Sequence, residues 1–339
     1  MAQVKVRESN IELLRIIAMF MILGLHVNMF AIDLPDKTDI LKNPLSSFTR
    51  LFFEYLCIIG VNVFVLISGW FGIKFKTKGL CNFLFQSLFI SIILFIPFVI
   101  NGDVELNRVN ILSAFLFYKN AYWFVWAYLI LYIISPVLNT FVENTGKCVQ
   151  KKVLISFFAV QTIIYIFTSC GFYIAGYDPL SFIGLYLLMR YIRIWSIEVG
   201  KNQLLAIWLT CTLVNFALSC TGNGTLTTIS LAYTNPLNII SATALVLYFT
   251  KLSFKSKVIN YISASCFAVY LVHMHFCIVR YYKEFAVKIY DNYGGIMYLA
   301  HITLFIIAVF AISVLIDKIR IWAFDRLWNF IEKRKYVTQ

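Results

Sequence analysis

Residues 80–100 read LCNFLFQSLFISIILFIPFVI and contain no charged side chain. An α-helix rises about 1.5 Å per residue, so a run of this length crosses the roughly 30 Å hydrocarbon core of a bilayer. A helix also pairs its backbone hydrogen-bonding groups internally, as lipid requires. The stretch therefore predicts a membrane-spanning helix.

The same pattern recurs along the whole chain and predicts an all-α fold, a polytopic integral membrane bundle of about ten transmembrane helices. Of the 339 residues, 61% are hydrophobic and only 13% are charged. Soluble domains are about 45–50% apolar and roughly 25% charged. The expected spans lie near residues 11–31, 51–73, 80–100, 122–142, 153–172, 179–197, 203–220, 236–252, 261–280 and 296–316.

Lysine and arginine residues indicate which helix ends face the cytoplasm. Of the 29, 20 fall in the alternate segments that include both termini, and eight fall in the opposite segments. Cytoplasmic loops carry the excess of positive charge, so we expect both termini in the cytoplasm. No basic run interleaved with aromatic residues occurs, so the net charge of +13 does not indicate nucleic acid binding.

Two parts are expected: a transmembrane domain over residues 1–316 and a basic amphipathic cytoplasmic tail over residues 317–339. The eight cysteines form no CxxC pair, which argues against zinc and thioredoxin-like sites. A bridge between Cys170 and Cys220 is compatible with two outer helix ends. Four aromatic residues of the tail are expected at the inner interface: Trp322, Phe324, Trp328 and Phe330.

The first span carries three ionisable residues, Glu12, Arg15 and His26. His26 follows Arg15 by 11 residues, close to three helical turns, so both project from one face about 16 Å apart. Glu12 precedes Arg15 by three residues and can pair with it. Ionisable residues inside a membrane indicate function. The alternative is structural: Arg15 snorkels to inner phosphates and His26 bonds a neighbouring helix.

Other polar residues in the spans give weaker signals. His273 and His275 point about 160° apart on a helix, so at most one can face a shared site. They lack acidic or cysteine partners nearby, and we expect no metal. Arg190 and Arg193 share a face near an inner helix end, where they snorkel or reach an anionic substrate.

Four motifs in order resemble those of the membrane acyltransferase family 3, the polytopic O-acyltransferases. RESNIELLRIIAMFMILGLH (residues 7–26) is similar to its opening, with Glu12 where Asp is commoner, and NVFVLISGWF (62–71) to its Ser-Gly-aromatic motif. YWFVWAYLILYIISPVLN (122–139) and SCFAVYLVHMH (265–275) resemble its two later segments. The resemblance implies catalytic roles for Glu12, Arg15 and His26. It implies substrate or donor binding for Ser68, Gly69, Trp70, Trp123, Tyr128, Tyr132 and His273; for Trp123 an interfacial aromatic belt is the alternative.

The chain departs from this family at one point. The arginine cluster usual after the Ser-Gly motif is replaced by Lys74, Lys76 and Lys78. Lysine can hold phosphate as a point charge but lacks the bidentate fork of arginine. We therefore expect these three lysines mainly to mark the cytoplasmic side.

The resemblance implies an O-acetyltransferase of the cell inner (plasma) membrane that moves an acetyl group from cytoplasmic acetyl-CoA, or another acyl-CoA. The acceptor would be a hydroxyl of a cell-surface or secreted carbohydrate or glycolipid. His26 would serve as general base or acyl carrier, and Arg15 would orient the donor. The alternative is a transporter of polysaccharide or lipid-linked sugar; a sensor or structural membrane protein fits the buried polar residues less well.

Overall fold

The computed structural model describes residues 8–117, 122–167 and 175–337, with side chains up to residue 333. All regular secondary structure in these ranges is helical. The chain divides into two compact units. The first comprises the described residues of Met1–Phe75 and Trp123–Ser263, and the second those of Lys76–Tyr122 and Ala264–Gln339.

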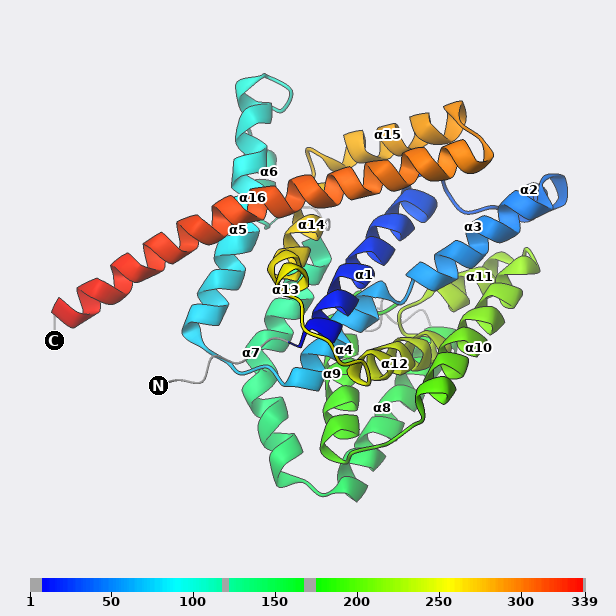
Figure 1. Cartoon of the computed structure of the whole chain (residues 1–339), viewed down its shortest axis with the longest axis horizontal. Helices are drawn as coiled ribbons and strands as arrows, with labels where there is room; N and C mark the ends of the chain where they lie inside the picture. Colours follow the sequence, from blue (N-terminus) through cyan, green and yellow to red (C-terminus); the bar gives the residue numbers. More distant parts are fainter. Residues whose placement is uncertain (1–7, 118–121, 168–174, 338–339) are drawn as a thin grey trace. The chain divides into compact units, whose positions relative to one another are not determined.

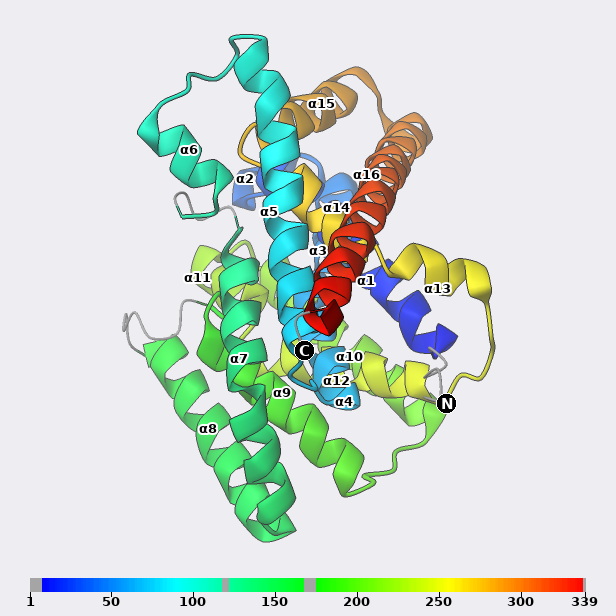
Figure 2. The same cartoon turned by 90° about the vertical axis from the view of Figure 1, so that its left-hand side faces the viewer.

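The first unit holds most of the helices (Figure 1). The best-packed pairs within it are α10 with α12, which lie side by side in Figures 1 and 2, and α4 with α9. Its elements are α1 (Ser9–Leu25), the π-helix η1 (His26–Ala31), α2 (Lys37–Lys42), α3 (Pro44–Cys57), α4 (Gly60–Phe71), α7 (Trp123–Asn144), α8 (Lys147–Phe167), α9 (Pro179–Ile194), α10 (Lys201–Cys220), α11 (Gly224–Leu231), α12 (Pro236–Thr250) and α13 (Lys257–Ser263).

Local sequence explains where several of these helices begin. α9 starts at Pro179, and the Asp178 side chain before it accepts a hydrogen bond from the Ser181 amide. α12 starts at Pro236 in the same way, after Asn235. Proline suits the first helical position because its fixed φ is helical and no amide is lost there, while Asp and Asn cap the free amides that follow.

The second unit contains α5 (Thr77–Ile100), α6 (Arg108–Ala114), α14 (Cys266–His273), α15 (Val279–Asn292) and α16 (Gly295–Val337). α16 is one continuous helix of 43 residues, seen at the red end of the chain in Figure 1. It crosses residue 316 without a break, so the expected division between domain and tail is not a break in secondary structure. That division stays a prediction.

The tail aromatics differ from one another in the structure. Phe324 is 5% exposed and its ring lies 5.4 Å from that of Phe85 on α5. Trp322 and Phe330 are exposed instead. Three buried polar side chains support the packing of α16 on α5. Arg320 pairs with Asp317 at 2.7 Å, and Gln86 of α5 donates a hydrogen bond of 2.9 Å to Asp317.

Eight of the ten expected spans coincide with helices long and apolar enough to cross a membrane. The remaining two are shorter. α9 has 16 residues. The span expected at residues 261–280 is interrupted between the end of α13 and the start of α14. Ser263 and Ser265 flank that break, and serine side chains bond locally to the backbone, which weakens a helix. The count of ten and the sides of the termini stay predictions.

Candidate active site

The first helix of unit 1 carries the expected pair of charges. On α1, Arg15 Nη1 lies 2.5 Å from Glu12 Oε1. The second carboxylate oxygen, Oε2, accepts a hydrogen bond of 2.6 Å from Ser263 Oγ at the end of α13. Glu12 is 4% exposed, and the Arg15 side chain is 28% exposed. The predicted pairing is confirmed, and it anchors Arg15 while part of the side chain stays accessible.

His26 stands where α1 gives way to the π-helix η1. The chain is α-helical from Ser9 to Leu25, so regular helix separates Arg15 from His26 and holds them on one face. His26 is 8% exposed, and its ring centroid lies 5.0 Å from that of Phe30. π-Helical turns are rare and occur frequently at functional sites. The catalytic role of His26 stays a prediction.

A buried polar cluster that the sequence pattern did not predict lies between η1 and α3. Asn28 Nδ2 donates to Glu54 Oε2 at 2.8 Å, and Arg50 Nε donates to Asn28 Oδ1 at 3.0 Å. Glu54 is fully buried, and its Oε1 has no hydrogen-bond partner among the described residues. A sequence signal existed, because Glu54 is the only acidic residue in the expected span 51–73.

Contacts between these helices fix the position of Glu54. A Cβ built on Gly24 would lie 3.5 Å from Cys57 Sγ, and four residues later Asn28 bonds Glu54. The two segments therefore run antiparallel, and Glu54 lies on α3 beside Asn28 of η1, two residues beyond His26 in the chain.

The Ser-Gly motif ends α4 and joins it to α7 and α9. Ser68 Oγ lies 3.1 Å from the Tyr128 hydroxyl on α7. A Cβ on Gly69 would lie only 2.7 Å from the backbone oxygen of Tyr186 on α9, so only glycine permits this helix contact. The structure therefore brings Ser68, Gly69 and Tyr128 together. Tyr128 is also close enough to Arg15 to be influenced by its charge.

Two arginines of α9 gather at the same end of α4. Arg193 donates a hydrogen bond to the backbone oxygen of Trp70, and its guanidinium carbon lies 4.7 Å from the Trp70 ring centre. The Arg190 guanidinium packs against Gly72, where a Cβ would lie 2.8 Å from Nη1, and Arg190 Nε is buried without a hydrogen-bond partner among the described residues. Arg15 and Arg193 both approach the Phe71 ring, at 5.8 and 5.7 Å. In the described part of the chain neither α9 arginine has an acidic partner.

Arg190 and Arg193 lie closer to the Ser-Gly motif than snorkelling alone would require. The lysines that replace the family's arginine cluster are placed differently: Lys74 is exposed in the first unit, and Lys78 Nζ lies 5.5 Å from the Trp328 ring in the second. The spacing of Arg190 and Arg193, three residues apart on one helix face, was the available signal.

Trp123 begins α7, and Tyr132 lies near its middle. Trp123, the first residue of the helix, contacts Tyr177 at 4.6 Å and stacks on Tyr233 at 6.1 Å between ring centres. Burial raises the pKa of the Tyr177 phenol above its ordinary value. The Tyr132 ring lies 5.5 Å from that of Phe75. Trp123 therefore lies within an aromatic cluster, while Trp126 is exposed.

His273 belongs to the second unit. It is fully buried, and its Nδ1 lies 2.5 Å from the Val269 backbone oxygen. His275 is also fully buried; its Nε2 donates to the Ser91 oxygen at 3.0 Å, and its Nδ1 accepts from the Cys277 amide. Different partners hold the two imidazoles, and the described residues contain no group of three potential metal ligands.

A bridge between Cys170 and Cys220, which the two helix ends would allow, is not found at Cys220. Cys220 is a free thiol, and Cys170 lies outside the described residues.

The residues that build this site belong to a known protein family. Residues 8–318 match the acyltransferase 3 family, described as an acyltransferase domain. No curated protein and no solved structure matches the chain. The match covers the Glu12–Arg15 pair, His26, the end of α4 and both arginines of α9. It favours acyl transfer over the alternative of a sugar transporter. The chain is a membrane acyltransferase and belongs to membrane acyltransferase family 3.

Proposed function

We propose that this acyltransferase moves an acetyl group from cytoplasmic acetyl-CoA to a hydroxyl group of a cell-surface or secreted carbohydrate, at the inner (plasma) membrane. The observation that carries the proposal is the polar face of α1. Arg15, paired with the buried Glu12, lies three turns before an imidazole that is 8% exposed. Such an arrangement within apolar helices suits a thioester donor that enters from one side and an acceptor that enters from the other.

His26 supplies the proton chemistry. As a general base it takes the proton of the acceptor hydroxyl, whose oxygen attacks the thioester carbonyl; the carbon–sulfur bond breaks, and the protonated imidazole returns the proton to the CoA thiolate. As an acyl carrier, the same nitrogen would hold the acetyl group before the acceptor arrives. Both routes require the neutral imidazole, which is the acid–base group best matched to neutral pH.

Arg15 is positioned to hold the donor. Its guanidinium is fixed by Glu12, and Glu12 is fixed in turn by Ser263. Part of Arg15 remains accessible, so it can donate to an oxygen of the donor. Preorganised donors of this kind stabilise developing negative charge without reorganising during the reaction.

The test has two parts. Mass spectrometry of surface glycans from cells with and without the gene should reveal one acetyl unit on a defined sugar only when the gene is present. Purified protein should release free CoA thiol from acetyl-CoA in the presence of that glycan. His301→Ala is the matched control for His26→Ala, because His301 lies in the second unit. Glycan lost from the surface, rather than unacetylated, would indicate transport and contradict the proposal.

A further inference from the structure

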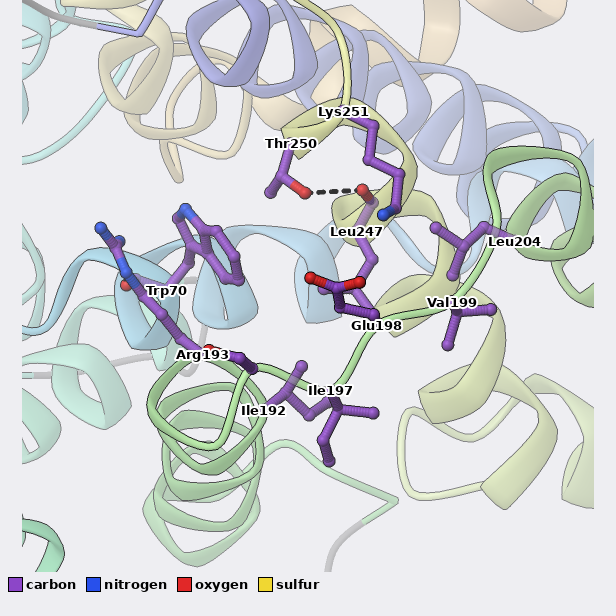
Figure 3. A pocket seen from close by; sticks show the side chains of 11 residues that line it. Trp70, Ile192, Arg193, Ile197, Glu198, Val199, Leu204, Leu247, Thr250 and Lys251 are labelled. Atoms are coloured by element: carbon purple, nitrogen blue, oxygen red, sulfur yellow. Dashed lines mark hydrogen bonds between the residues drawn. The ribbon is translucent and has the colours of Figure 1, made fainter.

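A polar space of about 310 Å³ lies beside the Trp70 indole in the first unit (Figure 3). The indole stands on one side of it, and the charged ends of Glu198 and Lys251 lie on the other. The Arg193 guanidinium is on the far side of the indole, where it bonds the Trp70 backbone oxygen. Glu198 and Lys251 therefore face a space that the Arg193 charge does not share.

An apolar groove, also of about 310 Å³, adjoins this polar space and lies between α9, α10 and α12. Ten of its twelve lining residues are aliphatic, and the other two are Tyr191 and Thr243. The Thr243 hydroxyl already donates its proton to the Ile239 backbone oxygen at 2.7 Å. A lining of this kind favours a hydrocarbon chain over a polar ligand.

The segment between α9 and α10 joins the two spaces. Ile197 and Val199 line both of them, whereas Glu198 between them lines only the polar space. Three helix residues also line both spaces: Ile192, Leu204 and Leu247. One molecule can therefore place an apolar chain in the groove and its polar head beside Glu198 and Lys251.

The groove has the length and the exposure expected of a lipid site. Ile240, in its lining, lies 11 residues before Lys251, about 16 Å along α12. One leaflet contributes about half of the roughly 30 Å hydrocarbon core, so this length matches a single leaflet. Ile207 and Ile240 are 37% and 46% exposed, and the groove therefore opens on the surface that membrane lipid covers.

The two charges at the polar end select the headgroup. Glu198 and Lys251 are both exposed, and neither forms an ion pair with a described residue. Opposite charges that face one space are complementary to a zwitterion, because the carboxylate accepts hydrogen bonds from an ammonium and the lysine donates to a phosphate. A trimethylammonium has no proton to donate to Glu198, and an anionic headgroup would be repelled by it.

We propose that the groove and the polar space together bind one phosphatidylethanolamine molecule. Its acyl chain lies in the apolar groove, its ammonium contacts Glu198, and its phosphate contacts Lys251. The inference goes beyond the proposed function, because it assigns no step of acyl transfer to these residues. The lipid fills the space between α9, α10 and α12 and so stabilises the folded protein.

The test uses full-length protein in nanodiscs that contain equal amounts of phosphatidylethanolamine, phosphatidylcholine and phosphatidylglycerol. Lipids retained on the released protein are identified by native mass spectrometry. The wild type should retain phosphatidylethanolamine in preference to the other two. Glu198→Gln and Lys251→Gln should each lower its retention about tenfold, since each removes a charge-assisted contact. The matched exposed controls, Glu143→Gln and Lys255→Gln, should leave it unchanged.

A second pair of variants tests the groove itself. Thr243→Phe places a large ring in the lining and should abolish retention of the bound lipid. Thr210→Phe adds the same ring to an exposed position of α10 outside the groove and should have no effect. The wild type should also melt at a higher temperature in detergent when phosphatidylethanolamine is added, and Thr243→Phe should not.

Three results would overturn the proposal. The first is equal retention of the three lipids by the wild type, which is ordinary annular lipid. The second is a preference for phosphatidylglycerol, which Glu198 should disfavour. The third is wild-type retention of phosphatidylethanolamine by both charge variants, even where Thr243→Phe loses lipid. Glu198 and Lys251 are exposed, so their variants decide the outcome if Thr243→Phe does not fold.

Discussion

At the residue scale, His26 decides whether the polar face of α1 is catalytic. We expect His26→Ala to lower acetyl transfer by about 10²–10⁴-fold, the range for a lost general base. A lost interhelical hydrogen bond would cost only about 0.6–2 kcal/mol of stability. Surface acetylation and the melting temperature in detergent should therefore separate the two roles.

His301→Ala is the control for this experiment, and Arg15→Lys is a second test of the proposed site. Arg15→Lys keeps the charge beside Glu12 but removes the planar fork, so transfer should fall while the protein remains folded. Normal acetylation by His26→Ala, together with a lower melting temperature, would make His26 structural and remove the proposed site.

Glu54 permits a second prediction at this scale. Glu54→Gln should change stability little, because its amide oxygen can still accept the bond from Asn28 Nδ2. Glu54→Ala should cost about 1–3 kcal/mol, since it leaves that buried donor unpaired. Thermal unfolding of both variants in one detergent measures the difference. Equal losses would mean that the carboxyl itself, rather than an acceptor at this position, supports the cluster.

At the scale of elements, the contact between α4 and α9 holds the Ser-Gly motif beside the α9 arginines. Gly69→Ala would place a Cβ 2.7 Å from the Tyr186 oxygen and 3.0 Å from Met189 Cβ. The two helices must separate, and we expect a loss of about 1–3 kcal/mol, as for other overpacked contacts.

Gly146→Ala is the matched control, because a Cβ built at this position would meet no described atom within 4 Å. The melting temperatures of the two variants should differ clearly, with Gly69→Ala lower. The same melting temperature for both would show that α4 and α9 can shift apart without cost, contrary to the packing described.

At the scale of the whole molecule, topology determines from which side the donor enters. The distribution of 20 basic residues against eight predicts both termini in the cytoplasm. Reporter fusions at the C-terminus should therefore be active only with a cytoplasmic reporter. A periplasmic or extracellular C-terminus would contradict this orientation and the cytoplasmic entry of the donor.

Hydropathy and the spacing of residues within single helices were enough to predict much of this protein's fold and one of its ion pairs. They indicated the all-helical membrane class, eight spans that coincide with long helices, and the Glu12–Arg15 pair on α1. These features depend on residues within one helix, where the 3.6-residue period and the length of an apolar run are decisive. The motifs likewise indicated the family, because each is contiguous in the chain.

Only the tertiary structure decided which residues meet from different helices. Glu54 reaches Asn28 across 26 residues, and Arg193 reaches Trp70 across 123 residues. Hydropathy also predicted full spans where α9 and α14 are short, since it records apolar content and not where a helix begins and ends. A charged residue in an apolar run has the same pattern whether it snorkels to the surface or lines a cavity. Its partners on other helices, which no local pattern specifies, distinguish the two.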